Sequence, residues 1–359
     1  MNALGTRIAR LIENQGPLSI AQFMTLALHD PREGYYATRD PFGRSGDFIT
    51  APEVSQIFGE LLGLWLVQAW QDQGALAPAR LVELGPGRGT LMADVLRAAR
   101  VAPDFLAAID VVLIESSPTL KAAQAERLKD AGVHIEWRGG WDEALVDRPL
   151  FVLANEFFDA LPISQYVKTG RGWCERMVTL ENGELAFALA PVPAAGLVVP
   201  PERGEAENGA VYETSPSGMA FTEEIANAIA AHGGAALIVD YGHDGIGFGD
   251  TLQAVKAHKF ADVLDTPGEA DLSAHVDFAA LSAAAAARGG ARVYGPTAQG
   301  EFLDRLGLAT RADTLSKANP ELEAQFAGEA ERLRDPRQMG ALFKALAIMP
   351  KDAPAPAGF

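Results

Sequence analysis

The feature that most constrains the fold is an alternation of short apolar runs with helical segments through the middle of the chain. Strand-like runs occur at residues 80–84, 109–114, 133–137, 150–154 and 236–241. Residues 91–100 and 120–131, which separate the first three runs, have the apolar spacing of helices. Strands that alternate with helices indicate a parallel sheet with helices on both faces, because each crossover passes over a face of the sheet. We therefore predict an α/β fold.

The first strand-like run leads into a glycine-rich turn, Gly85-Pro-Gly-Arg-Gly-Thr90, directly before the first helical segment. Glycines let the backbone approach a ligand closely, and amide groups at the helix start can bind its polar groups. Dinucleotide folds space these glycines as G-x-G-x-x-G, whereas here the third glycine comes one residue early and Thr90 takes the final place. The spacing favours a methyl-donor nucleoside over a nicotinamide dinucleotide, and a tight turn without a ligand is the alternative.

Two acidic residues flank this turn at places that suit S-adenosyl-L-methionine. Glu83 precedes the first glycine by two positions, where it would repel a pyrophosphate but attract the cationic amino group of a methionine. Glu115 ends the next strand-like run, and a carboxylate there can accept both ribose hydroxyls. Its alternative role is a capping or solvated acid. The predicted cofactor site comprises Glu83, Gly85, Pro86, Gly87, Gly89, Thr90, Glu115 and Ser116.

Longer segments of the chain resemble the MidA-like family of class I methyltransferases. The resemblance lies in Gly46-Asp-Phe-Ile-Thr-Ala-Pro-Glu-Val-Ser-Gln-Ile-Phe-Gly-Glu60, Glu83-Leu-Gly-Pro-Gly-Arg-Gly-Thr90, Ala154-Asn-Glu-Phe-Phe-Asp-Ala-Leu-Pro162 and Asp271-Leu-Ser-Ala-His-Val-Asp-Phe278. Mitochondrial members of the family are complex I assembly factors that methylate an arginine on an NADH dehydrogenase subunit. The resemblance implies a Rossmann-like seven-stranded sheet with an N-terminal helical segment and an inserted lid. It also implies protein arginine methylation, with a complex I subunit as the partner.

A second polar motif follows the fourth strand-like run, and it suits an arginine target. A guanidinium group is charged and its lone pairs are delocalised, but carboxylates could hold the nitrogens that are not attacked and later accept a proton. We predict Asn155, Glu156 and Asp159 as catalytic residues, and Asn155 also as a cofactor contact. If a helix begins here, Glu156 and Asp159 share a face of it. The alternative is that Asn155 or Asp159 only caps that helix.

The loop before the glycine turn is expected to contribute to the same site. The resemblance suggests that residues 46–50 fold over the cofactor, so Asp47 and Phe48 complete the predicted cofactor contacts. Thr50 and Glu53 have the spacing of a capping box and predict the start of a long apolar helix. Methylation of a nucleobase is a weaker interpretation, because Glu-Phe-Phe stands where such enzymes have Pro-Pro and an aromatic ring.

The domain organisation follows from these patterns. We predict that residues 1–75 form the helical segment with the cofactor-covering loop, and that residues 76–350 form the methyltransferase domain. A Gly- and Pro-rich region at about residues 164–234 is predicted as an antiparallel lid or substrate insertion. Residues 351–359, rich in Ala and Pro, are expected to be disordered.

The composition limits which classes of partner and which cellular compartment we expect. The formal net charge is −17, which repels a phosphate backbone, and no basic stripe is visible. We therefore expect no nucleic-acid partner and favour a basic protein or a small molecule. The single Cys174 excludes an internal disulfide and a cysteine-based metal cluster. A secretory pattern and a stretch of ~20 apolar residues are both missing, so we expect a cytoplasmic protein without membrane insertion.

His275 and Asp277 alternate as on one face of a strand, an arrangement that metal ligands can use. Methyl transfer needs no metal, so we predict a hydrogen-bonded groove or a helix cap there and no metal site. Two other functions stay open. One is an assembly chaperone with a vestigial cofactor site, and the other is an NAD-dependent oxidoreductase.

Overall fold

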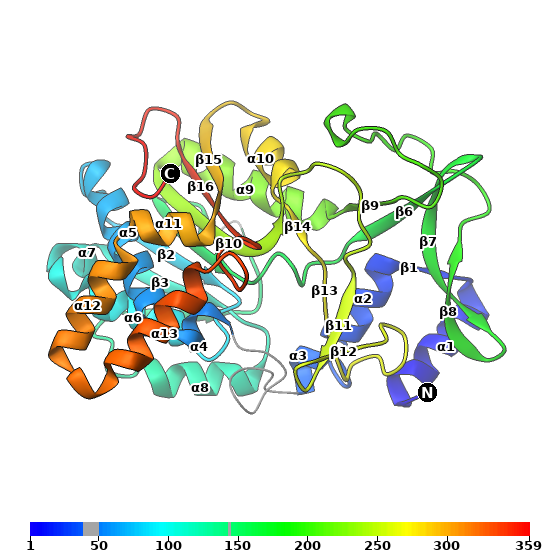
Figure 1. Ribbon diagram of the computed structural model, residues 1–359, viewed down its shortest axis with the longest axis horizontal. Coiled ribbons are helices and arrows are strands. Elements are labelled where there is room, and N and C mark those ends of the chain that lie inside the picture. The colour runs from blue at the N-terminus through cyan, green and yellow to red at the C-terminus, as the bar shows by residue number, and fades with distance from the viewer. Residues whose placement is uncertain (39–49, 143–144) are drawn as a thin grey trace. The chain divides into compact units, whose positions relative to one another are not determined.

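The computed structural model describes residues 1–38, 50–142 and 145–359, and the chain forms two units (Figure 1). Unit 1 comprises Met1–Phe48, Asp159–Ala220 and His243–Asp277. Unit 2 comprises Ile49–Phe158, Phe221–Gly242 and Phe278–Phe359. This division cuts across the predicted segment 1–75, because its first 48 residues group with unit 1 and the rest with unit 2. It also cuts the predicted insertion 164–234 at residue 220.

Unit 2 contains the predicted parallel sheet. Its strands are β2 (Ala79–Leu84), β3 (Ile109–Ile114), β4 (Ile135–Arg138), β5 (Leu150–Asn155), β10 (Gly234–His243), β15 (Ala291–Ala298) and β16 (Phe343–Pro350). They follow the order β15-β16-β10-β5-β2-β3-β4. The strands from β10 to β4 are parallel, and β16 runs antiparallel to both β10 and β15. The five strands predicted from apolar runs are all present in this sheet.

Helices cover both faces of this sheet, as Figure 1 shows for α5, α6 and α8 on one face and α9 and α10 on the other. The helices of unit 2, counting α9, which begins in unit 1, are α4 (Ala51–Val54), α5 (Gln56–Asp72), α6 (Thr90–Ala98), α7 (Pro103–Ala108), α8 (Pro118–Leu128), α9 (Pro216–His232), α10 (Phe278–Ala286), α11 (Gln299–Arg305), α12 (Leu308–Ala318) and α13 (Glu323–Arg334). Leu81, Leu113 and Leu153 point from the sheet into a core with Phe58 and Met92. Burial of these leucines determines which face of the sheet each strand residue occupies, because residues two apart on a strand share a face.

Helices α5 and α6 pack unusually closely because α5 carries glycines at the contact. A Cβ atom at Gly59 would lie 2.6 Å from the Cβ of Asp94, and one at Gly63 would lie 2.8 Å from the carbonyl oxygen of Val95. Any side chain at these places would push the helices apart. The glycines therefore allow α6 to lie directly against the long helix α5. The N-terminus of α6 follows the glycine turn.

Unit 1 combines helices with antiparallel strands around its own core. Its helices are α1 (Ala3–Gln15), α2 (Ile20–His29) and α3 (Tyr35–Thr38), and its strands are β1 (Leu18–Ser19), β6 (Ser164–Thr169), β7 (Gly172–Glu181), β8 (Glu184–Leu189), β9 (Val211–Thr214), β11 (Gln253–Lys256), β12 (Lys259–Ala261), β13 (Asp271–Ser273) and β14 (Val276–Asp277). One sheet has the order β1-β7-β6-β9 with β8 on β7, and a second has the order β12-β11-β13. Ile8, Phe23 and Val178 are buried together in its core.

Two local predictions differ from the structure. The hydroxyl of Thr50 makes no capping bond, and α5 begins after Ser55, whose Oγ accepts from the amide of Ile57 at 3.3 Å. The backbone of Ser55 is extended and interrupts the predicted single helix.

The C-terminal residues, expected to be disordered, pack on unit 2, since the Phe359 ring lies 5.0 Å from that of Phe302. The described chain includes no helix both long and apolar enough to cross a bilayer.

Candidate cofactor and substrate site

The glycine turn leaves β2 in a conformation that only glycine adopts without strain. Gly85, Gly87 and Gly89 have φ angles of +61°, +51° and +76°. A Cβ atom at Gly85 would also lie 3.1 Å from the ring of Phe157, and one at Gly89 would lie 3.3 Å from Cγ of Gln124. The amide of Gly89 donates to the carbonyl oxygen of Pro86 at 2.7 Å and closes the turn. The backbone conformation therefore favours glycine at all three positions, and the available space also favours it at Gly85 and Gly89.

Glu83 fits the binding of a cationic group. Its side chain is 2% exposed, and burial raises the pKa of its carboxyl to about 8. Its Oε2 atom has no hydrogen-bond partner among the described residues, and the same is true of Oδ1 of Asn155. Glu83 lies two residues after Leu81, and Asn155 lies two residues after Leu153. Because residues two apart on a strand share a face, both side chains lie on the face of the sheet that carries these core leucines. A ligand amino group could supply the missing donors, so the chemistry of these residues fits the methionine end of the cofactor.

Glu115 lies at the end of β3, buried beside the glycine turn. Its Oε1 accepts from the amide of Ser117 at 2.7 Å, and its Oε2 accepts from Nε2 of Gln124 at 3.3 Å. Burial raises the pKa of this carboxyl, while the amides of Ser117 and Ser116 oppose the rise. Each oxygen can accept a further hydrogen bond, which suits the ribose role predicted for it. Ser116 contacts this carboxylate through its backbone.

The turn after β5 is not the helix start that the sequence suggested. Glu156 has a φ angle of +50°, and the amides of Phe157 and Phe158 donate to Oδ2 of Asp240 at 3.1 and 2.9 Å. These bonds hold the chain in a bent turn, and the next element is strand β6. The prediction that Glu156 and Asp159 share a helix face is therefore wrong, because Glu156 has a left-handed backbone and the element that follows β5 is strand β6.

The carboxylate of Glu156 is held by two donors of unit 2. Its Oε1 accepts from the amide of Ala51 at 3.0 Å and from Nδ2 of Asn155 at 3.2 Å. Asn155 ends β5, which pairs with β2 in parallel, so Glu156 and Gly85 follow neighbouring strands at the same edge of the sheet. The structure thus brings Asn155 and Glu156 to the edge that carries the glycine turn.

Asp159, the third predicted catalytic residue, belongs to unit 1. Its side chain is buried, and its carbonyl oxygen accepts from the amide of Ala274 at 3.0 Å. Burial first, and then the charges of Asp271 and Asp159, raise the pKa of Tyr36 well above its usual value. The Tyr36 hydroxyl donates to Oδ1 of Asp271 at 2.8 Å. Asp159 therefore lies in an acidic, buried part of unit 1.

Other predicted site residues have different outcomes. The hydroxyl of Thr90 donates to Oε1 of Glu53 at 2.5 Å, so it joins α6 to α4. This bond also gives Glu53 a role other than the capping box. Asp47 and Phe48 lie outside the described residues. Their predicted contacts with the cofactor stay predictions.

His275 and Asp277 have different bonding partners in the structure. Asp277 forms an ion pair with the buried Arg203, and the backbone amide of His275 donates to Oγ1 of Thr251 at 2.9 Å. Burial lowers the pKa of the His275 imidazole. In the described part of the chain, no three His, Cys, Asp or Glu side chains gather as metal ligands would.

Two residues that sequence analysis did not select support the site. Asp240 holds the Glu156 turn, and Gln124 bonds both Glu115 and the carbonyl oxygen of Gly87. Gln124 could have been found from its position, because it lies between Leu120 and Leu128 on the buried stripe of α8. A polar side chain on such a stripe needs hydrogen-bond partners, which marks it as structural or functional.

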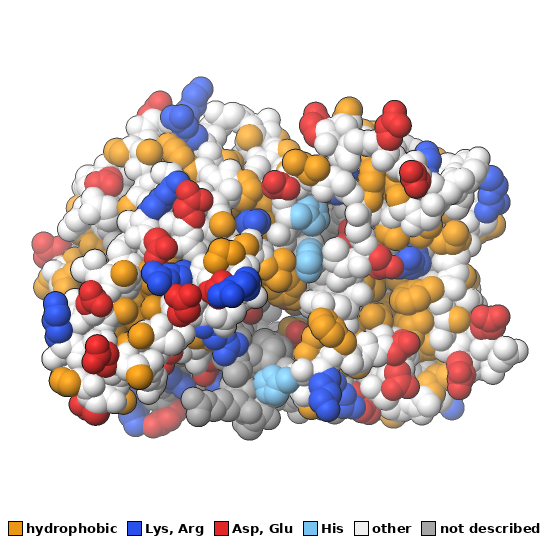
Figure 2. Space-filling view, in the orientation of Figure 1, with side chains coloured by type: hydrophobic (Ala, Val, Ile, Leu, Met, Phe, Trp, Pro, Cys, Tyr) orange, Lys and Arg blue, Asp and Glu red, His pale blue; other side chains and the backbone are white. Residues whose placement is uncertain are grey.

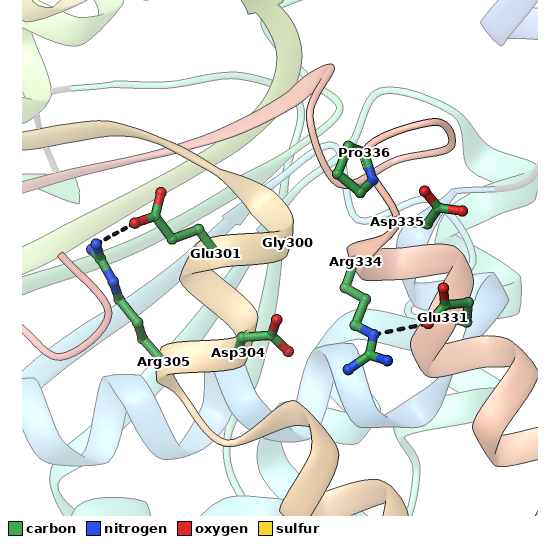
Figure 3. Close-up of a pocket in the computed structure, with 8 residues that line it drawn as sticks. All are labelled: Gly300, Glu301, Asp304, Arg305, Glu331, Arg334, Asp335 and Pro336. Carbon is green, nitrogen blue, oxygen red and sulfur yellow. Dashed lines mark hydrogen bonds and ion pairs between the residues drawn. The ribbon is translucent and has the colours of Figure 1, made fainter.

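A pocket of about 650 Å³ lies elsewhere in unit 2, between α11 and α13 (Figure 3). Four of its charged side chains pair along their own helices, Glu301 with Arg305 and Glu331 with Arg334. No residue of the glycine turn lines it. The face drawn in Figure 2 carries acidic and basic side chains intermixed.

Comparisons with known proteins show the family to which the chain belongs. A model of the family described as S-adenosyl-L-methionine-dependent methyltransferases matches residues 61–297. The mouse mitochondrial protein arginine methyltransferase NDUFAF7 is 39% identical over 94% of this chain and 82% of its own length. The human protein of that name is 38% identical, over 94% of this chain and 81% of its own. The Drosophila melanogaster homolog is 38% identical, over 97% of this chain and 85% of its own.

A solved structure also matches the whole chain. A protein from Burkholderia thailandensis whose structure was solved with bound S-adenosyl-homocysteine superposes with a TM-score of 0.87 at 28% identity. The match covers 99% of this chain and 94% of that one. These findings confirm the predicted class I methyltransferase fold and its cofactor.

The expected cytoplasmic location is contradicted by the NDUFAF7 relatives, which are named as mitochondrial proteins. Lack of a secretory pattern and of a long apolar run does not separate these compartments.

Proposed function

This chain belongs to the family of S-adenosyl-L-methionine-dependent methyltransferases, and we propose that it methylates an arginine in a subunit of respiratory complex I. The relatives named as protein arginine methyltransferases support the arginine target. The family match removes the reason to consider a nicotinamide cofactor. A protein substrate with a cationic side chain also suits a chain whose formal net charge is −17.

The position of Glu156 is the observation that carries this proposal. Glu156 directly follows β5, at the same edge of the sheet as the glycine turn after β2. Planar guanidinium groups match carboxylates in geometry and charge, whereas a neutral base does not. A left-handed backbone at a residue other than glycine costs free energy and is common where a side chain must be delivered to a ligand. Glu156 is therefore the residue we assign to the target arginine.

Glu83, Glu115 and Glu156 then have distinct tasks. When bound, the cofactor supplies an electrophilic methyl group on its sulfonium. Glu83 would hold the methionine amino group and Glu115 the ribose hydroxyls. The carboxylate of Glu156 would accept N–H groups of the guanidinium and keep its plane fixed, with Asp159 proposed as a second acid. After transfer, the same carboxylate would accept the proton that leaves the methylated nitrogen.

The test supplies wild type, Glu156→Gln and the exposed control Glu321→Gln to cells that lack the protein. Mass spectrometry of complex I subunits then reports arginine methylation, and calorimetry with S-adenosyl-homocysteine reports cofactor binding. We expect the methyl mark with wild type and with the control. Glu156→Gln should bind S-adenosyl-homocysteine normally but leave the target unmethylated, because the amide lacks the charge that orients a guanidinium.

The alternative outcomes are distinct. A mark that persists with Glu156→Gln would remove the role assigned to this carboxylate. Complex I that assembles equally well with both proteins, and carries no methyl mark that depends on wild type, would instead favour an assembly chaperone.

A further inference from the structure

We propose that Gln124 is a positioning residue that orients both the glycine turn and the ribose carboxylate for cofactor binding. This inference rests on the proposed cofactor site and adds a residue that does not itself touch the ligand. Gln124 lies on α8 and has no exposed surface. A buried primary amide must satisfy its donors and its acceptor within the protein.

The three bonds of Gln124 determine which way its amide faces. Its Nε2 donates to the carbonyl oxygen of Gly87 at 2.7 Å and to Oε2 of Glu115 at 3.3 Å. Its Oε1 accepts from Nε1 of Trp137 at 2.9 Å. The indole nitrogen of Trp137 is only a donor, so the opposite orientation of the amide would place two donors together. Trp137 on β4 therefore directs the amino group of Gln124 toward the turn.

The first consequence concerns the backbone of the turn. The bond to the carbonyl oxygen of Gly87 fixes the orientation of the peptide between Gly87 and Arg88. In a trans peptide the N–H points away from the C=O. Holding the carbonyl oxygen toward α8 therefore directs the amide of Arg88 away from α8. The turn is thus held in one of the conformations open to its glycines, before any ligand binds.

The second consequence concerns Glu115. The amide of Ser117 binds one carboxylate oxygen and Gln124 binds the other, so the carboxylate plane is fixed at both oxygens. A carboxylate held in this way offers its remaining lone pairs in set directions, which two neighbouring ribose hydroxyls require. Gln124 thus couples the orientation of Glu115 to that of the glycine turn.

The absence of a side chain at Gly89 makes this arrangement possible. A Cβ atom there would lie 3.3 Å from Cγ and 3.4 Å from Cα of Gln124. Helix α8 therefore lies directly against the turn, and a larger residue would push Gln124 away from its partners. The third glycine of the motif serves the contact with Gln124 as well as the bend of the chain.

The test compares Gln124→Leu and Gln124→Glu with wild type and with Glu126→Gln, a control on the exposed side of α8. Calorimetry at pH 6 and pH 8 measures the affinity for S-adenosyl-homocysteine relative to wild type at the same pH. We expect Gln124→Leu to bind at least roughly tenfold more weakly at both values, because Gly87, Glu115 and Trp137 lose a buried partner. The KM for S-adenosyl-L-methionine should rise similarly, while kcat stays within about twofold because no reacting group is touched.

Gln124→Glu gives a signature that loss of packing alone does not produce. At pH 8 the introduced carboxylate faces Glu115 and repels it, so binding should be as weak as with Gln124→Leu. As the pH falls from 8 to 6, a larger share of the pair holds a proton between the two carboxylates, which restores a donor there, and the affinity should recover severalfold toward wild type.

The outcomes separate the two proposals. Wild type that binds S-adenosyl-homocysteine while Gln124→Leu binds it equally well would overturn the positioning role alone. The same holds if the affinity of Gln124→Glu relative to wild type does not change with pH. Failure of wild type to bind the ligand at millimolar concentration would overturn the cofactor site itself, and the positioning role with it.

Discussion

Two turns leave neighbouring parallel strands of unit 2, and they meet the same backbone demand with different residues. After β2, three glycines take positive φ angles, and after β5 the left-handed residue is Glu156. A side chain in this conformation costs roughly 1–2 kcal/mol. The glycine turn avoids that cost. The Glu156 turn is instead held by two hydrogen bonds, which backbone amides donate to the Asp240 carboxylate.

The difference indicates what each turn presents. Where the backbone itself meets the ligand, a side chain would obstruct it, so glycine is required. Where a carboxylate must be delivered, the strained residue carries that side chain and its neighbours fix the conformation.

The largest effect is expected from Gly85→Val, which places a branched side chain in the first turn. Its φ of +61° is strained for valine, and even the Cβ atom would lie 3.1 Å from the Phe157 ring. We expect no detectable heat with S-adenosyl-homocysteine in calorimetry. Gly132→Val, at a glycine with positive φ but open space, is the matched control and should retain binding. Normal binding by Gly85→Val would show that the turn tolerates a side chain.

The second turn should fail differently with Asp240→Asn. The amide offers only one acceptor oxygen, so either the Phe157 and Phe158 amides or the Tyr241 amide lose their partner. We expect methyl incorporation into complex I from cells lacking the protein to fall ~10- to 100-fold, with a stability loss of about 1–3 kcal/mol in denaturant unfolding. Affinity for S-adenosyl-homocysteine should stay within about threefold. Loss of binding instead would mean that the two turns are not separable.

Glu83→Gln tests the electrostatics beside the first turn. The folded pKa of about 8 lies above the ordinary value of 4.5, so the folded state holds the proton more tightly. This contribution to stability is complete below pH 4.5 and is lost as pH rises through 8. Glu83→Gln should therefore gain stability relative to wild type as pH rises across this window. Unfolding curves at pH 5 and pH 9 measure the difference, and an equal difference at both values would contradict it.

The same residue predicts proton release on binding. At pH 7 the carboxyl of unliganded wild type is largely protonated, and it must ionise to pair with a cationic amino group. Calorimetry with S-adenosyl-homocysteine in two buffers of different ionisation enthalpy should show this release in wild type and not in Glu83→Gln.

The smallest effect is expected from Thr90→Val. Its hydroxyl bonds Glu53 and thereby joins α6 to α4. Loss of this bond should cost about 1 kcal/mol in denaturant unfolding. Thr310→Val, on an exposed part of α12, should cost less. We expect cofactor affinity to change less than about threefold, and a larger loss would return Thr90 to the cofactor contacts.

The sequence was informative where local patterns decide the structure. Buried parallel strands are near-continuous apolar runs, so β2, β3 and β5 could be located from the sequence pattern. The glycine turn could be assigned because its spacing reflects a local backbone requirement. Glu83 could be selected because an acid inside such a strand is unusual.

Features that depend on distant residues were not predictable. In place of the helix expected after Asn155 there is a turn with a left-handed residue at Glu156, and Asp240, more than 80 residues away, accepts two of its amides. The capping box at Thr50 fails because Glu53 bonds Thr90 instead. Gln124 has partners at Gly87 and Trp137 that no sequence spacing reveals.

The interleaving of the units has a practical consequence for protein engineering. The chain passes from one unit to the other at residues 48/49, 158/159, 220/221, 242/243 and 277/278. No single cut therefore releases either unit as one continuous polypeptide. Removal of unit 1 by deletion would sever the chain two residues after Glu156 and again on either side of the segment 221–242. A recombinant fragment made by truncation would either lack part of a unit or carry segments of the other, and exchange of modules with a relative would need several simultaneous junctions.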